Sequence, residues 1–251
     1  MAGHSKWAQI KRKKAKADAQ KGKIFTRLSR EIIIAARQGG GDPEANPRLK
    51  AAIQRAREAN IPFDNIQRAI QKGSGGVDGG NYDEVIYEGY GPGGVAFLVK
   101  VTTDNRNRTA SEVRHIFARY GGTLGEAGCV SWIFVQKGLI LVGKNNSFSE
   151  DDLLLFAVEY GAEDFREGED CYEITTAPED LARIKSGLEE RGFPVEEAEL
   201  TFIPQNLVPV AGQDGLRVLR LVQKLEELED VEEVYANFDI PPEIMEEATM
   251  G

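Results

Sequence analysis

The chain has 251 residues, with 31 Lys and Arg against 41 Asp and Glu, a formal net charge of −10 and two cysteines. This length is too great for one small module and indicates two or three compact units. The longest purely apolar run, Leu153 to Val158, has six residues, far short of the ~20 residues of a membrane-spanning helix. We therefore expect a multi-domain cytoplasmic protein without a signal peptide or a membrane contact.

Cysteine and histidine are too few and too scattered to predict a chemical centre. Cys129 and Cys171 lie 42 positions apart with no CxxC spacing, which argues against a disulfide scaffold and a thiolate zinc site. Both are expected to be buried as small hydrophobic residues. His4 and His115 lie far from either cysteine in the sequence. We expect no metal, no cofactor, no catalytic residue and no enzymatic activity.

Positive charge is concentrated at the N-terminus. Residues 1–80 contain 17 Lys or Arg and 7 Asp or Glu, whereas residues 81–251 contain 14 and 34. Such asymmetry is typical of a basic arm for a polyanion joined to a separate acidic body. Basic side chains would neutralise phosphates, and an aromatic residue in the arm could stack on a base. The predicted nucleic-acid contacts are Lys6, Trp7, Lys11, Arg12, Lys13, Lys14, Lys16, Lys21, Lys23, Arg27 and Arg30.

Residues 1–22 form the basic arm, and residues 23–78 are predicted to form a helical domain. Apolar residues recur every three to four positions from Phe25 to Ala36, which predicts a first helix that ends at the glycines 39–41. Asn46-Pro47 would begin a second helix, as a capping residue before proline at the first helical position. A third helix is expected from Phe63 to Lys72-Gly73, and the glycine-rich residues 73–80 mark a domain boundary.

The remaining sequence predicts two α/β domains. The pattern indicates strands at 82–88, 95–103 and 129–135, with a helix at 109–120. From Gly138 the order strand, helix, strand, strand, helix, strand is that of a split βαβ, ferredoxin-like fold. A helix at 214–228 and a strand at 231–237 would complete the interrupted middle domain. The predicted class is α+β, with a middle domain of residues 79–136 plus 205–251 and an inserted ferredoxin-like domain at 137–204.

Two glycine motifs mimic phosphate-binding loops. Residues 89–94 satisfy GxGxxG, but a β-like run follows where a dinucleotide site needs a helix, so a turn between strands is predicted. Residues 138–144 spell GxxxxGK, yet the intervening residues are apolar and Asn145 replaces the Ser or Thr of a nucleotide-binding loop. A buried strand is predicted there. The acidic run from Glu226 to Glu233 is expected to be a solvated face.

A small cationic patch, Asn105 to Thr109, interrupts the acidic body. Arg106 and Arg108 precede a predicted helix, where Thr109 or Asn107 could cap and free N–H groups could receive an anion. The patch is therefore a secondary candidate anion site. The alternative is that both arginines pair with neighbouring carboxylates at the surface.

Three apolar side chains at alternate positions, Val130, Trp132 and Phe134, are predicted to share one face of a strand. Such a face could stack bases. Core packing is the other interpretation, and it is favoured because the surrounding sequence is not the basic and aromatic motif of an RNA-binding strand.

Several segments together resemble the YebC/PmpR family. They are the first 11 residues, residues 21–32, Asn46 to Leu49, residues 59–66, residues 87–96, Thr103 to Thr109 and residues 121–125. The resemblance implies an N-terminal helical domain, two α/β domains and regulation of gene expression. Bacterial members are described as DNA-binding transcriptional regulators, mitochondrial relatives as translational activators, and a role at ribosomes stalled on proline runs is also ascribed to the family. Carried over by motif are Lys6, Trp7, Lys11, Lys21, Lys23, Arg27, Arg106 and Arg108.

These observations leave more than one function open. A DNA-binding transcriptional regulator is the first hypothesis. No helix carries Asn, Gln and Arg at base-reading spacing, which favours backbone recognition and makes a translation factor bound to ribosomal RNA and the ribosome the alternative. A third hypothesis is an adaptor whose acidic body binds a basic partner. The expected partner is DNA or ribosomal RNA, and a monomer is favoured.

Overall fold

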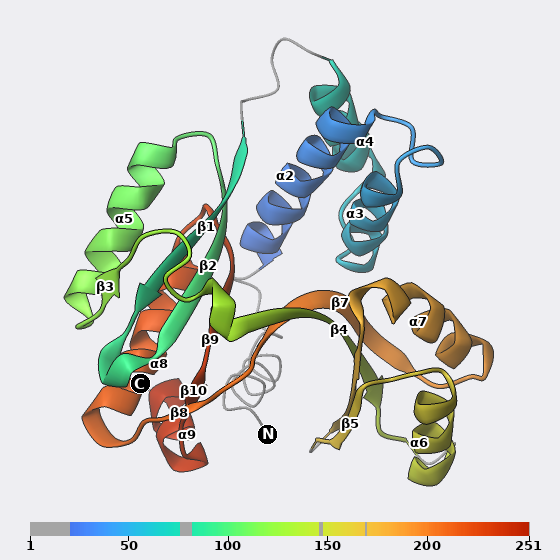
Figure 1. The fold of residues 1–251 in the computed structure, drawn as a ribbon. Helices are drawn as coiled ribbons and strands as arrows, with labels where there is room; N and C mark the ends of the chain where they lie inside the picture. The colour runs from blue at the N-terminus through green and yellow to red at the C-terminus, as the bar shows by residue number, and fades with distance from the viewer. Residues whose placement is uncertain (1–20, 76–81, 146–147, 169, 251) are drawn as a thin grey trace. The chain divides into compact units, whose positions relative to one another are not determined.

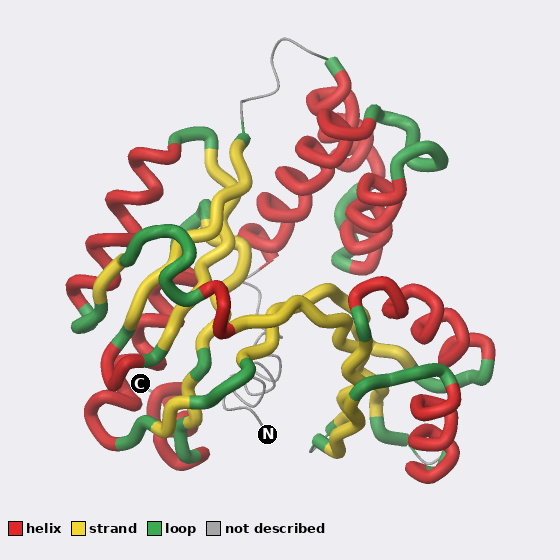
Figure 2. Tube along the Cα trace, viewed as in Figure 1, coloured by secondary structure: helices red, strands yellow, loops and turns green. Residues whose placement is uncertain are grey.

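The computed structural model describes residues 21–75, 82–145, 148–168 and 170–250 (Figure 1). They form two compact units, one at 132–206 and the other made of the described residues that precede and follow it. The smaller unit is therefore an insertion in the larger one. Helices and strands both contribute to each unit (Figure 2), which confirms the predicted α+β class.

Three helices form the first part of the larger unit, namely α2 (Lys21–Gly39), α3 (Pro47–Glu58) and α4 (Phe63–Ser74). Each contributes a residue to a common apolar core, in which Ile32, Leu49 and Ile66 are almost completely buried. The predicted three-helix domain is confirmed.

Asn46 fixes the turn between α2 and α3. Its side-chain oxygen accepts a hydrogen bond from the N–H of Leu49 (3.1 Å), and its amide nitrogen donates to the carbonyl oxygens of Ala35 and Gly40 (2.8 Å each). One buried side chain thus begins a helix and closes the end of the previous one, as predicted for a capping residue before Pro47.

α4 continues to Ser74, past the predicted end at Lys72-Gly73. Gly73 is buried in the helix, and a β-carbon there would lie 2.4 Å from the carbonyl oxygen of Ile33 in α2. This glycine therefore serves close helix packing rather than termination, a use that its position in the sequence does not distinguish.

The middle domain, residues 82–131 with 207–250, contains a four-stranded antiparallel sheet in the order β3-β1-β2-β9. The strands are β1 (Asp83–Tyr90), β2 (Ala96–Thr103), β3 (Thr123–Leu124) and β9 (Val231–Ala236). Two helices, α5 (Arg106–Arg119) and α8 (Gly212–Glu227), pack in one apolar core with β2 and β9. Because β1 lies between β2 and β3, the segment β2-α5-β3 is a split βαβ unit. A short parallel pair, β8 (Val208–Pro209) and β10 (Phe238–Asp239), and α9 (Pro242–Met250) complete the domain.

The inserted unit has the ferredoxin-like arrangement that the sequence predicts. Its strands are β4 (Phe134–Gly143), β5 (Asp164–Glu167), β6 (Cys171–Thr176) and β7 (Val195–Pro204), in the antiparallel order β5-β6-β4-β7. Two helices, α6 (Glu150–Glu159) and α7 (Leu181–Glu190), contribute to its apolar core, and the short helix η4 (Pro178–Asp180) precedes α7.

Both glycine motifs have the structures that were predicted. Pro92–Gly94 is a short 3₁₀ turn (η2) between β1 and β2, in which Gly93 and Gly94 have positive φ angles of 68° and 77°. Residues 138–143 belong to β4 and are largely buried. Neither segment opens a helix, so neither has the geometry of a phosphate loop.

The predicted strand at 129–135 is wrong at its start, because Ser131–Ile133 forms a 3₁₀ turn (η3). The buried carboxylate of Glu88 holds the preceding loop. It accepts hydrogen bonds from the N–H groups of Gly128 (2.7 Å), Val130 and Ser131 (2.8 Å each). Backbone donors that converge on one carboxylate cannot also form a ladder with a neighbouring strand, so the loop stays in a turn.

The predicted shared face of Val130, Trp132 and Phe134 is therefore also wrong. Val130 and Phe134 are buried, whereas Trp132 is 67% exposed. Cys171 is buried as predicted, but Cys129 is only partly buried. A base-stacking strand surface does not exist here.

We expect Glu88→Gln to lower the free energy of unfolding by about 1–3 kcal/mol at pH 7, since a buried hydrogen-bond acceptor loses its charge. Burial alone would raise the pKa of Glu88, but the backbone N–H groups of Gly128, Val130 and Ser131 outweigh burial and hold it below its ordinary value. The stabilisation is therefore complete above pH ~4.5 and disappears as the pH falls through the lowered pKa. Urea unfolding between pH 7 and 3 measures it, with Glu112→Gln on the exposed surface of α5 as control. An equal loss at all pH values would contradict the charged hydrogen-bond account.

Candidate nucleic-acid interface

Most of the predicted contact residues lie in the basic arm. Lys6, Trp7, Lys11, Arg12, Lys13, Lys14 and Lys16 fall outside the described residues. Lys21 and Lys23 belong to the first turn of α2, and Arg27 and Arg30 follow in the next turns of the same helix. The sequence prediction thus extends from the arm onto α2.

Arg27 and Arg30 bind the protein's own acidic segment. The guanidinium of Arg27 donates to the carbonyl oxygen of Glu232 (2.9 Å), and that of Arg30 donates to the carboxylates of Asp230 (3.1 Å) and Glu229 (2.9 Å). Only 14% of the Arg30 side chain is exposed. These two arginines connect α2 to the start of β9, which leaves them less able to meet a phosphate than the sequence suggested.

Asp230 is the centre of this contact. It is 4% exposed and accepts hydrogen bonds from Arg108 (2.7 Å), Thr109 (2.7 Å) and Thr103 (3.1 Å), in addition to Arg30. We call these five residues the Asp230 cluster. Burial alone would raise the pKa of Asp230, but the hydrogen bonds from Arg108, Thr109 and Thr103 and the charge of Arg108 hold it below its ordinary value.

The secondary anion site at Arg106 and Arg108 is therefore occupied by carboxylates of the chain itself. The Nε of Arg106 lies 3.8 Å from a carboxylate oxygen of Asp83. The guanidinium of Arg108 lies 2.9 Å from a carboxylate oxygen of Asp104 and also pairs with Asp230. The structure thus agrees with the alternative that both arginines pair with nearby acids. The side chains of Arg106 and Arg108 remain 63% and 45% exposed, so an incoming phosphate would compete with these carboxylates.

The helix that follows this patch begins earlier than predicted. Its N-cap is Asn105, whose side-chain oxygen accepts from the N–H of Arg108 (3.1 Å), so the predicted caps Asn107 and Thr109 are wrong. Asn105 N–H donates to Thr103 Oγ1 (2.9 Å) at the end of β2, which places the cap directly after the strand. Thr109 instead turns its hydroxyl inward to Asp230.

The acidic run from Glu226 to Glu233 is not wholly the solvated face that was predicted. Asp230 is buried, and the side chain of Glu232 is only 10% exposed. Glu232 Oε2 lies 3.1 Å from Lys100 Nζ. Burial alone would raise the pKa of Glu232, but the charge of Lys100 and the hydroxyl of Thr102 hold it below its ordinary value. The partners of these acids come from positions far away in the sequence, so a local pattern contains no signal for them.

The helical domain exposes further cations that the sequence reasoning did not single out. Arg57 on α3, and Arg68 and Lys72 on α4, are exposed and form no ion pair with the described residues. Phe63, the first residue of α4, is 61% exposed. Exposed unpaired cations and an exposed aromatic ring are the groups that bind phosphates and stack on bases. The sequence signal was present in the basic surplus of residues 1–80.

Within the described ranges, no group of His, Cys, Asp or Glu side chains has the arrangement of a metal site. Among the same residues, no helix is long and apolar enough to cross a membrane. His115 lies exposed on α5, away from both cysteines in the sequence.

Two family descriptions together match nearly the whole chain. Residues 5–76 match the TACO1/YebC protein N-terminal domain, and residues 82–238 match the TACO1/YebC second and third domain. The chain therefore belongs to the TACO1/YebC family.

Similar proteins extend over almost the full length. A probable transcriptional regulatory protein of Pelotomaculum thermopropionicum is 63% identical and covers 96% of this chain and 99% of its own. One of the same description from Dictyoglomus turgidum is 56% identical, with coverage of 98% and 99%. The crystal structure of a conserved hypothetical protein from Aquifex aeolicus has a TM-score of 0.83 and 52% identity, and the match covers 90% of this chain and 93% of that one.

Proposed function

We propose that this protein is a non-enzymatic regulator of gene expression that binds nucleic acid through the basic arm and the helical domain. One observation carries the proposal. The first 30 residues contain ten Lys or Arg and a single acid, within a chain whose net charge is −10. Lys and Arg side chains that neutralise phosphates release counterions and so supply affinity with little sequence information.

Transcription is the first form of this proposal. The relatives named above are described as probable transcriptional regulatory proteins, which supports DNA as the polymer. The contacts proposed are the arm residues with Lys21 and Lys23, extended by Arg57, Arg68 and Lys72 on the helical domain. Arg27, Arg30, Arg106 and Arg108 would contribute only where a phosphate competes with their carboxylate partners.

A translation factor that binds ribosomal RNA is the second form. The observation that favours it is in the sequence, where no helix carries Asn, Gln and Arg at base-reading spacing, so that the basic residues would contact backbone phosphates. Recognition by backbone and shape fits a structured RNA, where a basic arm that folds on binding is common.

A salt series separates the two forms. Binding of the full chain would be measured to a promoter-length DNA duplex, to a scrambled duplex of equal length and to ribosomes. A preference for one DNA sequence that survives at ~0.2 M salt, where backbone affinity has fallen steeply, supports transcription. Weak, sequence-independent DNA binding beside a saturable ribosome complex supports translation. If neither polymer binds at ~0.05 M salt, the proposed function is wrong.

A further inference from the structure

Helix α6 presents apolar side chains on two opposite sides. Leu153, Phe156 and Ala157 are completely buried in the core of the inserted unit. The intervening Leu154, Leu155 and Val158 are 38%, 62% and 66% exposed. A helix that packs one face on a core normally has polar residues on the other. Since spacings of three and four residues bring side chains together on a helix, these three form a continuous exposed apolar patch.

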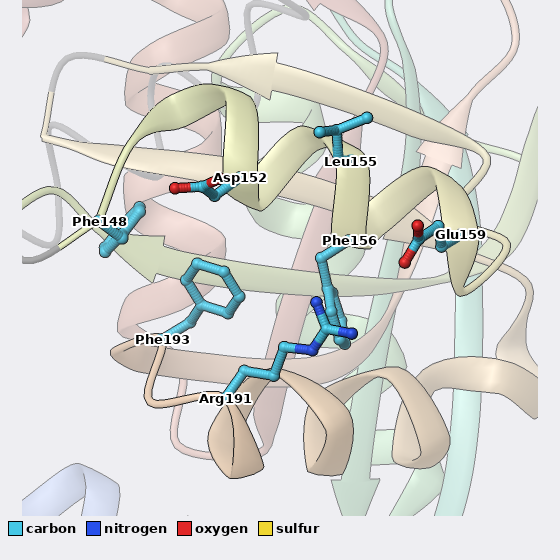
Figure 3. Close-up of a pocket in the computed structure, with 7 residues that line it drawn as sticks. All are labelled: Phe148, Asp152, Leu155, Phe156, Glu159, Arg191 and Phe193. Atoms are coloured by element: carbon cyan, nitrogen blue, oxygen red, sulfur yellow. The ribbon is translucent and has the colours of Figure 1, made fainter.

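A pocket lies beside this patch. Its volume is about 370 Å³, and three aromatic rings, Phe148, Phe156 and Phe193, line it together with Leu155 (Figure 3). The polar lining groups are Asp152, Glu159 and Arg191. The guanidinium of Arg191 lies over the Phe156 ring at 5.0 Å from its centroid, which gives one wall of the pocket a cation–π contact.

Acidic groups surround the patch and the pocket. The inserted unit, residues 132–206, contains 17 Asp or Glu and 6 Lys or Arg. The first turn of α6 carries Glu150, Asp151 and Asp152, and Glu159 is its last residue. Asp152, Leu155 and Glu159 follow at helical spacing, so that two carboxylates about 10 Å apart along the axis flank one exposed leucine. The arrangement is acid, apolar, acid.

We propose that the exposed side of α6 and the adjoining pocket form a docking site for a basic amphipathic segment of a partner protein. An apolar or aromatic side chain of the segment enters the pocket and packs against the rings of Phe148 and Phe193, which contact each other edge to face with centroids 5.1 Å apart. Lys or Arg on either side of it pairs with Asp152 and Glu159. The charge of the unit repels a nucleic-acid backbone, and a second copy of this surface would place like charges against each other. A basic partner is the occupant that satisfies both the apolar and the acidic groups.

The test uses the full chain and a synthetic helical peptide of about five turns. The peptide has Leu and Phe three positions apart on one face of the helix. One Lys precedes this pair and one Lys follows it, and the two Lys are seven positions apart. A second peptide with Glu in place of Lys serves as its charge control. Fluorescence anisotropy at ~0.1 M salt should show saturable binding of the lysine peptide and none of the glutamate peptide.

Three double variants locate the binding. Leu155→Ser with Val158→Ser removes the two most exposed of the three apolar side chains of the patch, and Asp152→Lys with Glu159→Lys reverses the flanking charges. Each pair should weaken peptide binding by at least about ten-fold. The matched control, Glu179→Lys with Glu196→Lys, makes the same charge change at exposed positions that do not line the pocket and should change binding less than about two-fold.

Other results would overturn the proposal. If the control pair weakens binding of the lysine peptide equally, the peptide is attracted by the overall charge of the unit and there is no specific site. No saturable binding of the lysine peptide would exclude a basic amphipathic partner. Self-association of the full chain that Leu155→Ser with Val158→Ser abolishes, measured by sedimentation, would assign this surface to a second copy instead. None of these outcomes depends on nucleic-acid binding.

Discussion

Substitution of Lys11, Arg12, Lys13 and Lys14 together by Glu is expected to weaken nucleic-acid binding by on the order of 10³-fold at ~0.1 M salt. Each lost phosphate contact removes about 0.9 from the slope of log K against log salt for duplex DNA, and four contacts are removed. The same variant should therefore have a slope that is smaller by about 4. Filter binding or anisotropy over a salt series measures both quantities on DNA and on ribosomal RNA.

The control variant makes the same change in net charge outside the arm. Arg114, Arg183, Arg217 and Lys224 are exposed in the α/β part of the chain, and their joint substitution by Glu should leave the salt slope nearly unchanged. If the two variants lose affinity equally, binding follows the total charge of the protein, and the proposed arm contact is wrong.

Substitution of Asp230 by Asn is expected to lower the free energy of unfolding by about 3 kcal/mol, which is typical when a buried ion pair loses one partner. The change leaves Arg30, which is 14% exposed, without its buried carboxylate. It also removes the charge that accepts hydrogen bonds from Thr103 and Thr109. Calorimetry is the appropriate measurement, since the two units can unfold in separate transitions. The transition of the larger unit should shift to lower temperature.

Glu229 provides a matched control for this prediction. It is the adjacent residue, it also pairs with Arg30, and its side chain is 71% exposed. Glu229→Gln should cost less than about 1 kcal/mol, because an exposed ion pair contributes little. Equal costs for the two substitutions would show that burial of Asp230 adds nothing to its interactions.

The sequence predicted those features that depend on local pattern. The start of α3 follows from Asn46 and Pro47, and the order of elements in the inserted unit follows from apolar periodicity. The turn at η3 was missed, because Glu88 lies about forty positions before the N–H groups that it binds. Alternating apolar residues at 130–134 predict a strand only while their backbone donors remain available for a ladder.

The candidate interface could be predicted only in part for the same reason. The basic surplus of the arm is a property of composition, so it is visible without a structure. The pairing of Asp230 with Arg30 joins residues 200 positions apart. In the sequence Asp230 is one acid among many, and Arg30 is one more cation on a helix. Only the fold shows that each neutralises the other.

The ends of the inserted unit meet. Phe134 at the start of β4 pairs with Pro204 at the end of β7, and the N–H of Gln205 donates to the carbonyl oxygen of Ile133 (2.8 Å). The entropy lost on closing a loop depends on the length of flexible chain between its ends. Once the inserted unit has folded, that flexible length is a few residues, so the middle domain folds as though a short turn joined its two halves. When the insertion folds first, the middle domain loses little additional loop-closure entropy, although an entire second fold lies within its sequence.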